Sequence, residues 1–203
     1  MTAPTVLVMD LGGVTCRWLP DRRLDALAAL SGLPAGTIDQ QVFGSGFDDA
    51  GERGRFTLAA FTEQLVAVLG LAASPDDDQA VRTAWSLAFE PDRAVLRLIR
   101  AATCRTALFT NNGPLLEAAL RAELSDVGDA FDQLVLSHRL GVTKPEAAAF
   151  ERATEALGAA PGDVFFVDDS PANVAAAAAA GWRSYHFTTA LSLQAALTDA
   201  HIL

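Results

Sequence analysis

Four groups of polar residues, spread along most of the chain, have the residue types needed for chemistry on a phosphate group. They are Asp10, Thr110 with Asn111, Lys144, and Asp168 with Asp169. Two or three carboxylates can hold one Mg²⁺, a small hard cation that prefers oxygen ligands. A hydroxyl and an ammonium can bind phosphate oxygens while a free carboxylate attacks phosphorus to give an aspartyl phosphate.

Lys144 is unusual because it is the only lysine in the chain, whereas the other fourteen basic residues are arginines. A compact, freely rotating ammonium differs chemically from a planar guanidinium. This difference makes Lys144 a candidate for a specific point-charge role.

Each polar group also has a purely structural interpretation. Asp10 could be a turn residue, Thr110 could precede a helix cap, and Asp168–Asp169 leads into Ser170 and a proline, a typical helix start. Two adjacent carboxylates at a strand end repel each other unless a cation or donor is near, which favours a metal site.

The elements that must position these residues follow from short apolar runs. Runs at residues 5–9, 106–109, 134–136, 164–167 and 184–187 predict strands, and polar residues follow the first four. Helical stretches at 91–101, 114–124, 145–157 and 171–180 alternate with them, each beginning at a proline. We therefore expect an α/β fold with a Rossmann-like three-layer α/β/α core, a parallel sheet, and ligands at the carboxyl ends of the strands.

Residues 16–90 interrupt this alternation. They show helical patterns at 22–30, 58–69 and 77–89, and no clear strand. We expect an inserted α-helical domain at 16–90, and a core domain made of 1–15 and 91–203. Glycine-rich stretches at 44–46 and 51–54 are predicted to be loops of the insert, and they are candidates to face the site.

Composition excludes several classes of protein. The 203 residues are 51% apolar, which is enough for a full core, and the net charge of −10 provides no basic footprint for nucleic acid. The absence of a long apolar run and of a basic, apolar start predicts no membrane span and no secretory signal, so we expect a cytoplasmic protein. Two isolated cysteines are expected to be reduced. The oligomeric state is left open.

At this point the sequence resembles the haloacid dehalogenase-like (HAD) hydrolase superfamily, in its phosphatase-like branch with a small helical cap (subfamily I). The resemblance covers nearly the whole chain and rests on four motifs in the family's order. In sequence they are Asp10-Leu11-Gly12-Gly13-Val14, Ala107-Leu108-Phe109-Thr110-Asn111-Asn112, Gly141-Val142-Thr143-Lys144-Pro145, and Phe166-Val167-Asp168-Asp169-Ser170 followed by Asn173.

The resemblance implies a role for each matching position. Asp10 would be nucleophile and metal ligand, Thr110 and Asn111 would bind phosphate, and Lys144 would stabilise charge. Asp169 would bind Mg²⁺ directly and Asp168 through water. Asn173 and Ser170 would not touch the ion but would support the residues around it, with Asn173 orienting Lys144 or an aspartate. The insert would be the cap that selects the substrate. The implied activity is a Mg²⁺-dependent phosphatase of a small phosphorylated metabolite.

Gly12 departs from the family pattern. The family's phosphatases generally carry an aspartate two positions after the nucleophile, where it acts as general acid and base and supplies a backbone carbonyl to the metal. Gly12 keeps the backbone carbonyl and lies beside the phosphate, so we expect metal binding to persist. Because Gly12 has no acidic side chain, we expect esters with poor leaving groups to react slowly.

Two alternatives stay open at this stage. The first is a 2-haloacid dehalogenase-type hydrolase, in which Asp10 attacks carbon without a metal. The second is a phosphometabolite-binding protein with little turnover, which the glycine at position 12 favours.

Overall fold

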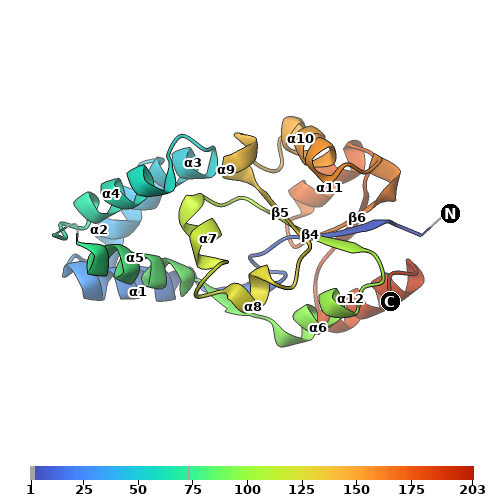
Figure 1. The fold of residues 1–203 in the computed structure, drawn as a ribbon, viewed down its shortest axis with the longest axis horizontal. Helices are drawn as coiled ribbons and strands as arrows, with labels where there is room; N and C mark the ends of the chain where they lie inside the picture. Colours follow the sequence, from blue (N-terminus) through green and yellow to red (C-terminus); the bar gives the residue numbers. More distant parts are fainter. Residues whose placement is uncertain (1–2, 73) are drawn as a thin grey trace.

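A five-stranded parallel sheet lies at the centre of the larger part of the protein (Figure 1). The computed structural model describes residues 3–72 and 74–203; Met1 and Thr2, part of the start expected to lack a secretory signal, lie outside the described residues. The strand order is β5 (Gln133–Leu136), β4 (Arg105–Thr110), β1 (Val6–Met9), β6 (Val164–Asp168) and β7 (Arg183–His186). All neighbouring strands are parallel, so the five predicted strands and the predicted fold class are confirmed.

Alternate residues of the central strands face two separate hydrophobic layers. Val6 and Val8 of β1 pack with α10 (Ala147–Leu157) and α11 (Pro171–Ala179), whereas Leu7 and Met9 pack with α6 (Arg93–Ala101) and α12 (Ala190–Asp199). Since successive side chains of a strand point to opposite faces, a strand that is apolar throughout requires helices on both sides. This arrangement gives the three layers, and it places the polar residues after each strand at one edge.

Two of the four predicted helix starts are wrong. α7 (Pro114–Ala119) and α11 do begin at a proline, but α6 begins at Arg93 and α10 at Ala147. The Asp92 side chain accepts hydrogen bonds from the amides of Ala94 and Val95, which caps α6 two residues later than expected. The short helices α8 (Ser125–Gly128), α9 (Ser137–Leu140) and η2 (Pro161–Asp163) complete this part.

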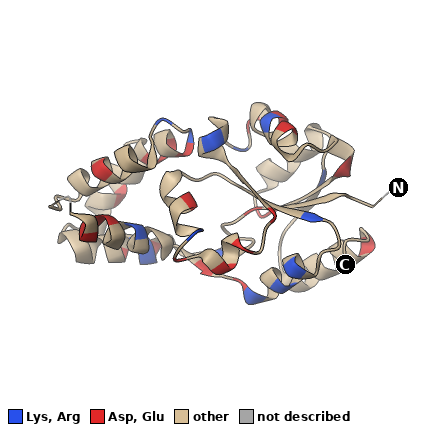
Figure 2. Cartoon of the chain, viewed as in Figure 1, with Lys and Arg blue, Asp and Glu red and all other residues tan. Residues whose placement is uncertain are grey.

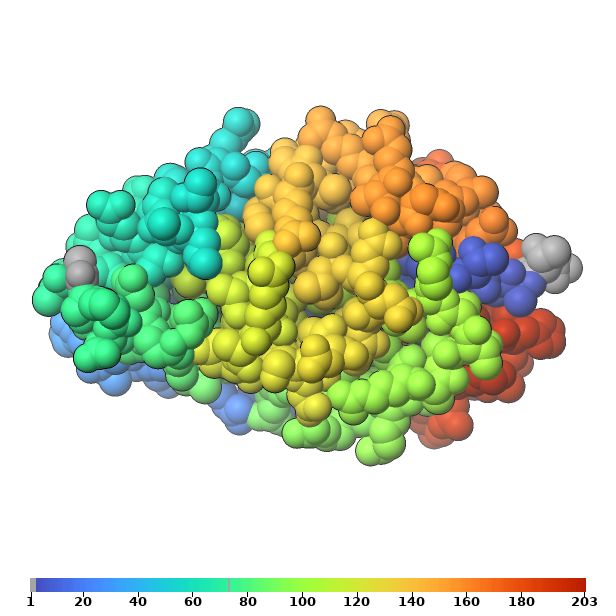
Figure 3. Space-filling view, viewed as in Figure 1, coloured from blue at the N-terminus to red at the C-terminus, as the bar shows by residue number. Residues whose placement is uncertain are grey.

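The segment between β1 and α6 is mostly helical, and its helices pack around an apolar cluster that also takes in Leu115 of α7. Its elements are α1 (Pro20–Ser31), α2 (Ala35–Ile38), η1 (Asp39–Gly44), α3 (Phe47–Glu52), α4 (Leu58–Val68) and α5 (Pro75–Ser86). The space-filling view shows this segment at one end of the molecule, directly against the sheet part (Figure 3). The predicted glycine-rich loops are confirmed in part: residues 45–46 and 53–54 lie outside helices, whereas Gly44 belongs to η1 and residues 51–52 belong to α3.

Two short strands at the ends of this segment were not predicted. β2 (Cys16–Trp18) and β3 (Phe89–Pro91) form an antiparallel pair, with Trp18 opposite Phe89. Strands of three residues are too short to show an alternating pattern, so they could not be predicted from the sequence. Pro91 therefore ends a strand and does not begin α6.

Charged residues of both signs are interspersed over the helices (Figure 2). Two of the arginines on α6, Arg93 and Arg100, form ion pairs with Asp126 of α8. Within residues 3–72 and 74–203, every helix is too short or too polar to span a bilayer.

Candidate active site

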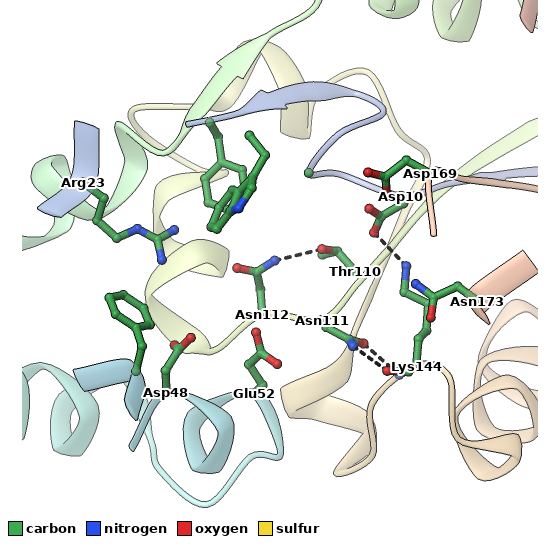
Figure 4. A pocket seen from close by; sticks show the side chains of 14 residues that line it. Asp10, Arg23, Asp48, Glu52, Thr110, Asn111, Asn112, Lys144, Asp169 and Asn173 are labelled. Atoms are coloured by element: carbon green, nitrogen blue, oxygen red, sulfur yellow. Dashed lines mark hydrogen bonds and ion pairs between the residues drawn. The ribbon is translucent and has the colours of Figure 1, made fainter. Parts of the chain in front are cut away.

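A cavity of about 270 Å³ opens at the carboxyl ends of β1, β4 and β6. Its walls come from two parts of the chain, as Figure 4 shows. On the sheet side the lining residues follow strands; on the other side they come from the helical segment and the β2–β3 pair. The sheet side brings together the residues predicted from sequence, namely Asp10, Gly12, Thr110, Asn111, Lys144, Asp169 and Asn173.

Lys144 is at the centre of the sheet-side residues. Its Nζ donates hydrogen bonds to Asp10 Oδ1 and Asp168 Oδ2, both at 2.7 Å, and to the Phe109 carbonyl oxygen at 2.9 Å. The side chain is 1% exposed. A buried ammonium with two carboxylate partners fixes the relative positions of residues that are more than 130 positions apart.

The carboxylates of Asp10, Asp168 and Asp169 form one cluster. One oxygen from each lies within 4.8 Å of the others, the spacing of a group that can hold a metal ion. Asp168 is fully buried, and its oxygens accept hydrogen bonds from Lys144, from the Ser170 amide and from the side chain of Asn173 at 3.0 and 3.1 Å. Asn173 and Ser170 thus hold Asp168 in place.

Burial and neighbouring charge shift the proton affinities of this cluster. Burial raises the pKa of Asp10 to about 6; the Lys144 ammonium opposes the rise and Asp168 adds to it. For Lys144 itself burial favours the neutral amine, but the two carboxylates outweigh it and the pKa is raised. The pKa of Asp169 is raised by burial and by Asp168. Lys144 is therefore cationic at neutral pH, and its positive charge stabilises the ionised carboxylates beside it.

The loop after β4 places Thr110 and two asparagines at the cavity. Thr110 is 2% exposed, and its Oγ1 accepts a hydrogen bond from the Asn112 side chain at 2.8 Å. Asn111 was expected to contact phosphate, but its side chain donates to the Lys144 carbonyl oxygen at 2.8 Å and accepts from the Lys144 amide at 2.9 Å. The Asn111 side chain therefore positions the Lys144 backbone.

Gly12 lies beneath two aromatic rings. A Cβ at this position would be 3.6 Å from Trp18 Cε3 and 3.8 Å from Phe89 Cε1, which is ordinary van der Waals contact. The two rings pack together with centroids 5.0 Å apart. No described residue donates a hydrogen bond to the Gly12 carbonyl oxygen, which therefore remains available as a ligand.

Three charged residues on the opposite wall were not predicted from the sequence: Arg23 of α1, and Asp48 and Glu52 of α3. Burial raises the pKa of Asp48 to about 6 and that of Glu52 to about 8, with neighbouring acids adding to the latter. The only sequence signal was their position, since Asp48 and Glu52 fall within or beside the glycine-rich stretches proposed to face the site.

Arg23 is a buried cation surrounded by aromatic rings. It is 3% exposed, its Nε donates to the Trp85 carbonyl oxygen at 3.1 Å, and its guanidinium lies over the Trp85 ring at 4.2 Å. Its Nη2 is buried and has no hydrogen-bond partner among the described residues. Burial lowers the pKa of Arg23 to about 10, so the guanidinium stays charged at neutral pH.

Comparison with known families agrees with this geometry. The model of the haloacid dehalogenase-like hydrolases matches residues 39–181, which is more than half of the chain. The chain belongs to the haloacid dehalogenase-like hydrolase family. It is accordingly an enzyme of the hydrolase class, and the resemblance inferred from the four motifs is confirmed.

Individual proteins extend the likeness over nearly the full length of the chain. Phosphatase MT3486 of Mycobacterium tuberculosis is 27% identical over 188 residues, covering 89% of this chain and 86% of that protein. A HAD-like hydrolase structure from Porphyromonas gingivalis superposes with a TM-score of 0.77 at 24% identity, covering 98% of each chain. A HAD family enzyme from Bacteroides thetaiotaomicron, solved with magnesium and inorganic phosphate, has a TM-score of 0.72 at 22% identity, covering 91% of this chain and 94% of that one.

Proposed function

We propose that this HAD-like hydrolase is a Mg²⁺-dependent phosphatase that removes phosphate from a small phosphorylated metabolite through an aspartyl phosphate on Asp10. The observation that carries the proposal is the meeting of Asp10, Asp168 and Asp169 within 4.8 Å, with Lys144 Nζ 2.7 Å from Asp10. The phosphatase name of the M. tuberculosis relative and the magnesium and phosphate bound to the B. thetaiotaomicron enzyme support it.

The donor set suits Mg²⁺. The carboxylates of Asp10 and Asp169 and the carbonyl oxygen of Gly12 are hard oxygen ligands, which Mg²⁺ prefers. Both oxygens of Asp168 already accept hydrogen bonds from protein donors, so a contact through water suits this residue better than direct ligation. When bound, the ion would neutralise charge on the phosphate and on the clustered acids.

The remaining residues of the sheet side then have separate tasks. Lys144 holds Asp10 Oδ1, so Oδ2 is the oxygen proposed to attack phosphorus. The Thr110 hydroxyl binds a phosphate oxygen. The three hydrogen bonds of the Lys144 ammonium are already made within the protein, so its positive charge stabilises the nearby negative charge without a direct bond to phosphate. Asn111 orients Lys144 through its backbone. Water then attacks the aspartyl phosphate and releases inorganic phosphate.

We also propose that residues 16–90 act as a cap over this site, with 1–15 and 91–203 forming the core domain. This division is supported by the apolar cluster of the helical segment, to which only Leu115 of the sheet part is added, and by the charged residues that the segment contributes to the cavity. A cavity of about 270 Å³ suits a small phosphorylated molecule better than a polymer.

The test is hydrolysis of p-nitrophenyl phosphate by the purified protein, followed by a screen of phosphorylated metabolites. We expect turnover with Mg²⁺, none with EDTA, and none from Asp10→Asn. Turnover that persists in EDTA, or in Asp10→Asn, would exclude the mechanism. Release of halide from a 2-haloacid in EDTA would support the dehalogenase alternative instead.

A further inference from the structure

The proposed function leaves one chemical requirement without a residue. A phosphate ester with a poor leaving group needs a proton on the departing oxygen, and Gly12, two positions after Asp10, has no side chain to donate one. The inference below rests on the proposed phosphatase function. The proton donor must lie across the phosphate from Asp10, because attacking and leaving oxygens are roughly in line.

The end of α3 is fixed next to the phosphate-binding loop. The Ser137 hydroxyl donates to the Glu52 carbonyl oxygen at 2.8 Å and accepts a hydrogen bond from the Asn112 amide at 3.0 Å. Gly113 packs against the same helix end, since a Cβ there would lie 3.7 Å from the Glu52 amide nitrogen. Glu52 is thus held beside the loop that carries Thr110.

The Glu52 side chain lines the cavity on the wall away from Asp10. Figure 4 shows Glu52 and Asp48 on one side and Asp10 on the other, with Asn112 and Thr110 between them. If a phosphate is bound between Asp10 and Thr110 and attacked in line by Asp10, its leaving group would lie on the side of the cavity away from Asp10, which is the side of this wall.

The Glu52 carboxyl makes no hydrogen bond or ion pair with any residue in the described part of the chain. The charges around it are Asp48 and Asp49 on α3, Arg53 next to it, and Arg23 on α1; burial and the two acids raise its pKa to about 8. On α9, which packs against α3, His138 pairs with Glu117 at 3.1 Å instead. Burial and the neighbouring acids therefore favour the protonated carboxyl at neutral pH, and its oxygens are free of hydrogen bonds to the described residues.

We infer that Glu52 is the general acid of the reaction, in place of the acid absent from position 12. As Asp10 forms its bond to phosphorus, the bond from phosphorus to the leaving oxygen breaks. The electron pair stays on that oxygen, and Glu52 gives it a proton, so that a neutral alcohol leaves. The resulting Glu52 carboxylate takes a proton from the water that attacks the aspartyl phosphate, which restores the acid as phosphate is released.

The experiment compares two substrates of similar shape, p-nitrophenyl phosphate and p-methylphenyl phosphate, at saturating Mg²⁺. The first has a good leaving group that needs little protonation and the second a poor one. In Glu52→Gln, we expect kcat/KM for the methyl compound to fall by about 10²-fold, and that for the nitro compound to change by about threefold or less. The decline of kcat/KM above pH 8 for the methyl compound should disappear.

Asp48→Asn is the matched control, because Asp48 lies one turn earlier on α3 and lines the same cavity. Its effect on the two substrates should be equal, whatever its size. Equal losses on both substrates in Glu52→Gln, or no loss on either, would overturn the inference. Failure of the proposed function is distinguishable, because then the native protein itself would hydrolyse neither substrate.

Discussion

The carboxylate of Asp169 occupies the space that a side chain at position 13 would need. A Cβ on Gly13 would lie 2.1 Å from Asp169 Oδ2, and Gly13 has a φ of +81°, which L side chains rarely adopt. The loop after β1 can therefore bring Asp10 close to Asp169 only if position 13 is glycine.

Gly13→Ala should abolish Mg²⁺-dependent hydrolysis while the sheet still folds. The added methyl group forces Asp169 away from Asp10 and strains the backbone, at a cost of about 1–3 kcal/mol. Activity assays and denaturant titration measure the two effects. Gly32→Ala, at another left-handed glycine but with open space around its Cβ, separates backbone strain from displacement of Asp169. Full activity of Gly13→Ala would contradict the metal site.

Lys144→Met should destabilise the protein strongly as well as inactivate it. The substitution leaves Asp10 and Asp168 buried without their shared cation, and loss of one member of a buried charged group costs about 3–5 kcal/mol. The free energy of unfolding, from urea titration, measures the loss. Arg93→Met, which breaks an exposed ion pair with Asp126, should cost less than about 1 kcal/mol. Similar losses in both variants would argue against the role of Lys144.

Mg²⁺ should raise the melting temperature through Asp169. A ligand that binds only the folded state at about 100 times its Kd stabilises that state by about 2.7 kcal/mol, which should shift the midpoint by at least about 5 °C. Asp169→Asn should remove most of the shift, measured against EDTA in thermal unfolding. Asp199→Asn, at an exposed position of α12, should retain it. An unchanged shift in Asp169→Asn would place the ion elsewhere.

An acid introduced at position 12 should rescue the loss of Glu52. The Cβ of a new side chain at Gly12 fits against Trp18 and Phe89 without a clash. We expect Gly12→Asp to raise kcat/KM for p-methylphenyl phosphate by about tenfold or more in the Glu52→Gln background. Gly12→Asn has the same shape and cannot donate in this way, so it should give no rescue. Equal effects of the two substitutions would rule out acid catalysis from position 12.

The stability of the protein should depend on the protonation of Glu52. Its pKa rises from an ordinary value of 4.5 to about 8 in the folded protein, so the folded state keeps a proton that the unfolded chain loses. This contribution is fully present below pH 4.5 and is lost as the pH rises to 8. Relative to the native protein, Glu52→Gln should therefore gain on the order of 1–3 kcal/mol between these limits, in urea titrations at each pH. A difference independent of pH would contradict the buried acid.

Much of the sheet side was predictable because it depends on local patterns. Asp10 and Asp169 each come after a short apolar run, and the carboxyl ends of parallel strands meet at one edge. Lys144 lies farther from its strand, and its being the only lysine singled it out. Asn111 was predicted correctly to lie at the cavity. Its hydrogen bonds to the Lys144 backbone could not be predicted, because a side-chain amide can bind phosphate or backbone equally well.

The helical side was not predictable for a physical reason. Arg23 and Glu52 lie on different helices, and only the packing of those helices brings both to the cavity. Each would be ordinary surface charge on an isolated amphipathic helix. Buried charge of this kind has no sequence signature, because the sequence does not show which side of a short helix is covered.

The pairing of β2 with β3 has a mechanical consequence. Cys16 lies opposite Pro91 and Trp18 opposite Phe89, so the chain enters and leaves the helical segment through a single two-stranded ribbon. Backbone hydrogen bonds resist sliding of one strand along the other, whereas a narrow ribbon twists and flexes easily. Any rotation of the helical segment about this ribbon would therefore carry Trp18 and Phe89 together, and with them the two aromatic rings that cover Gly12.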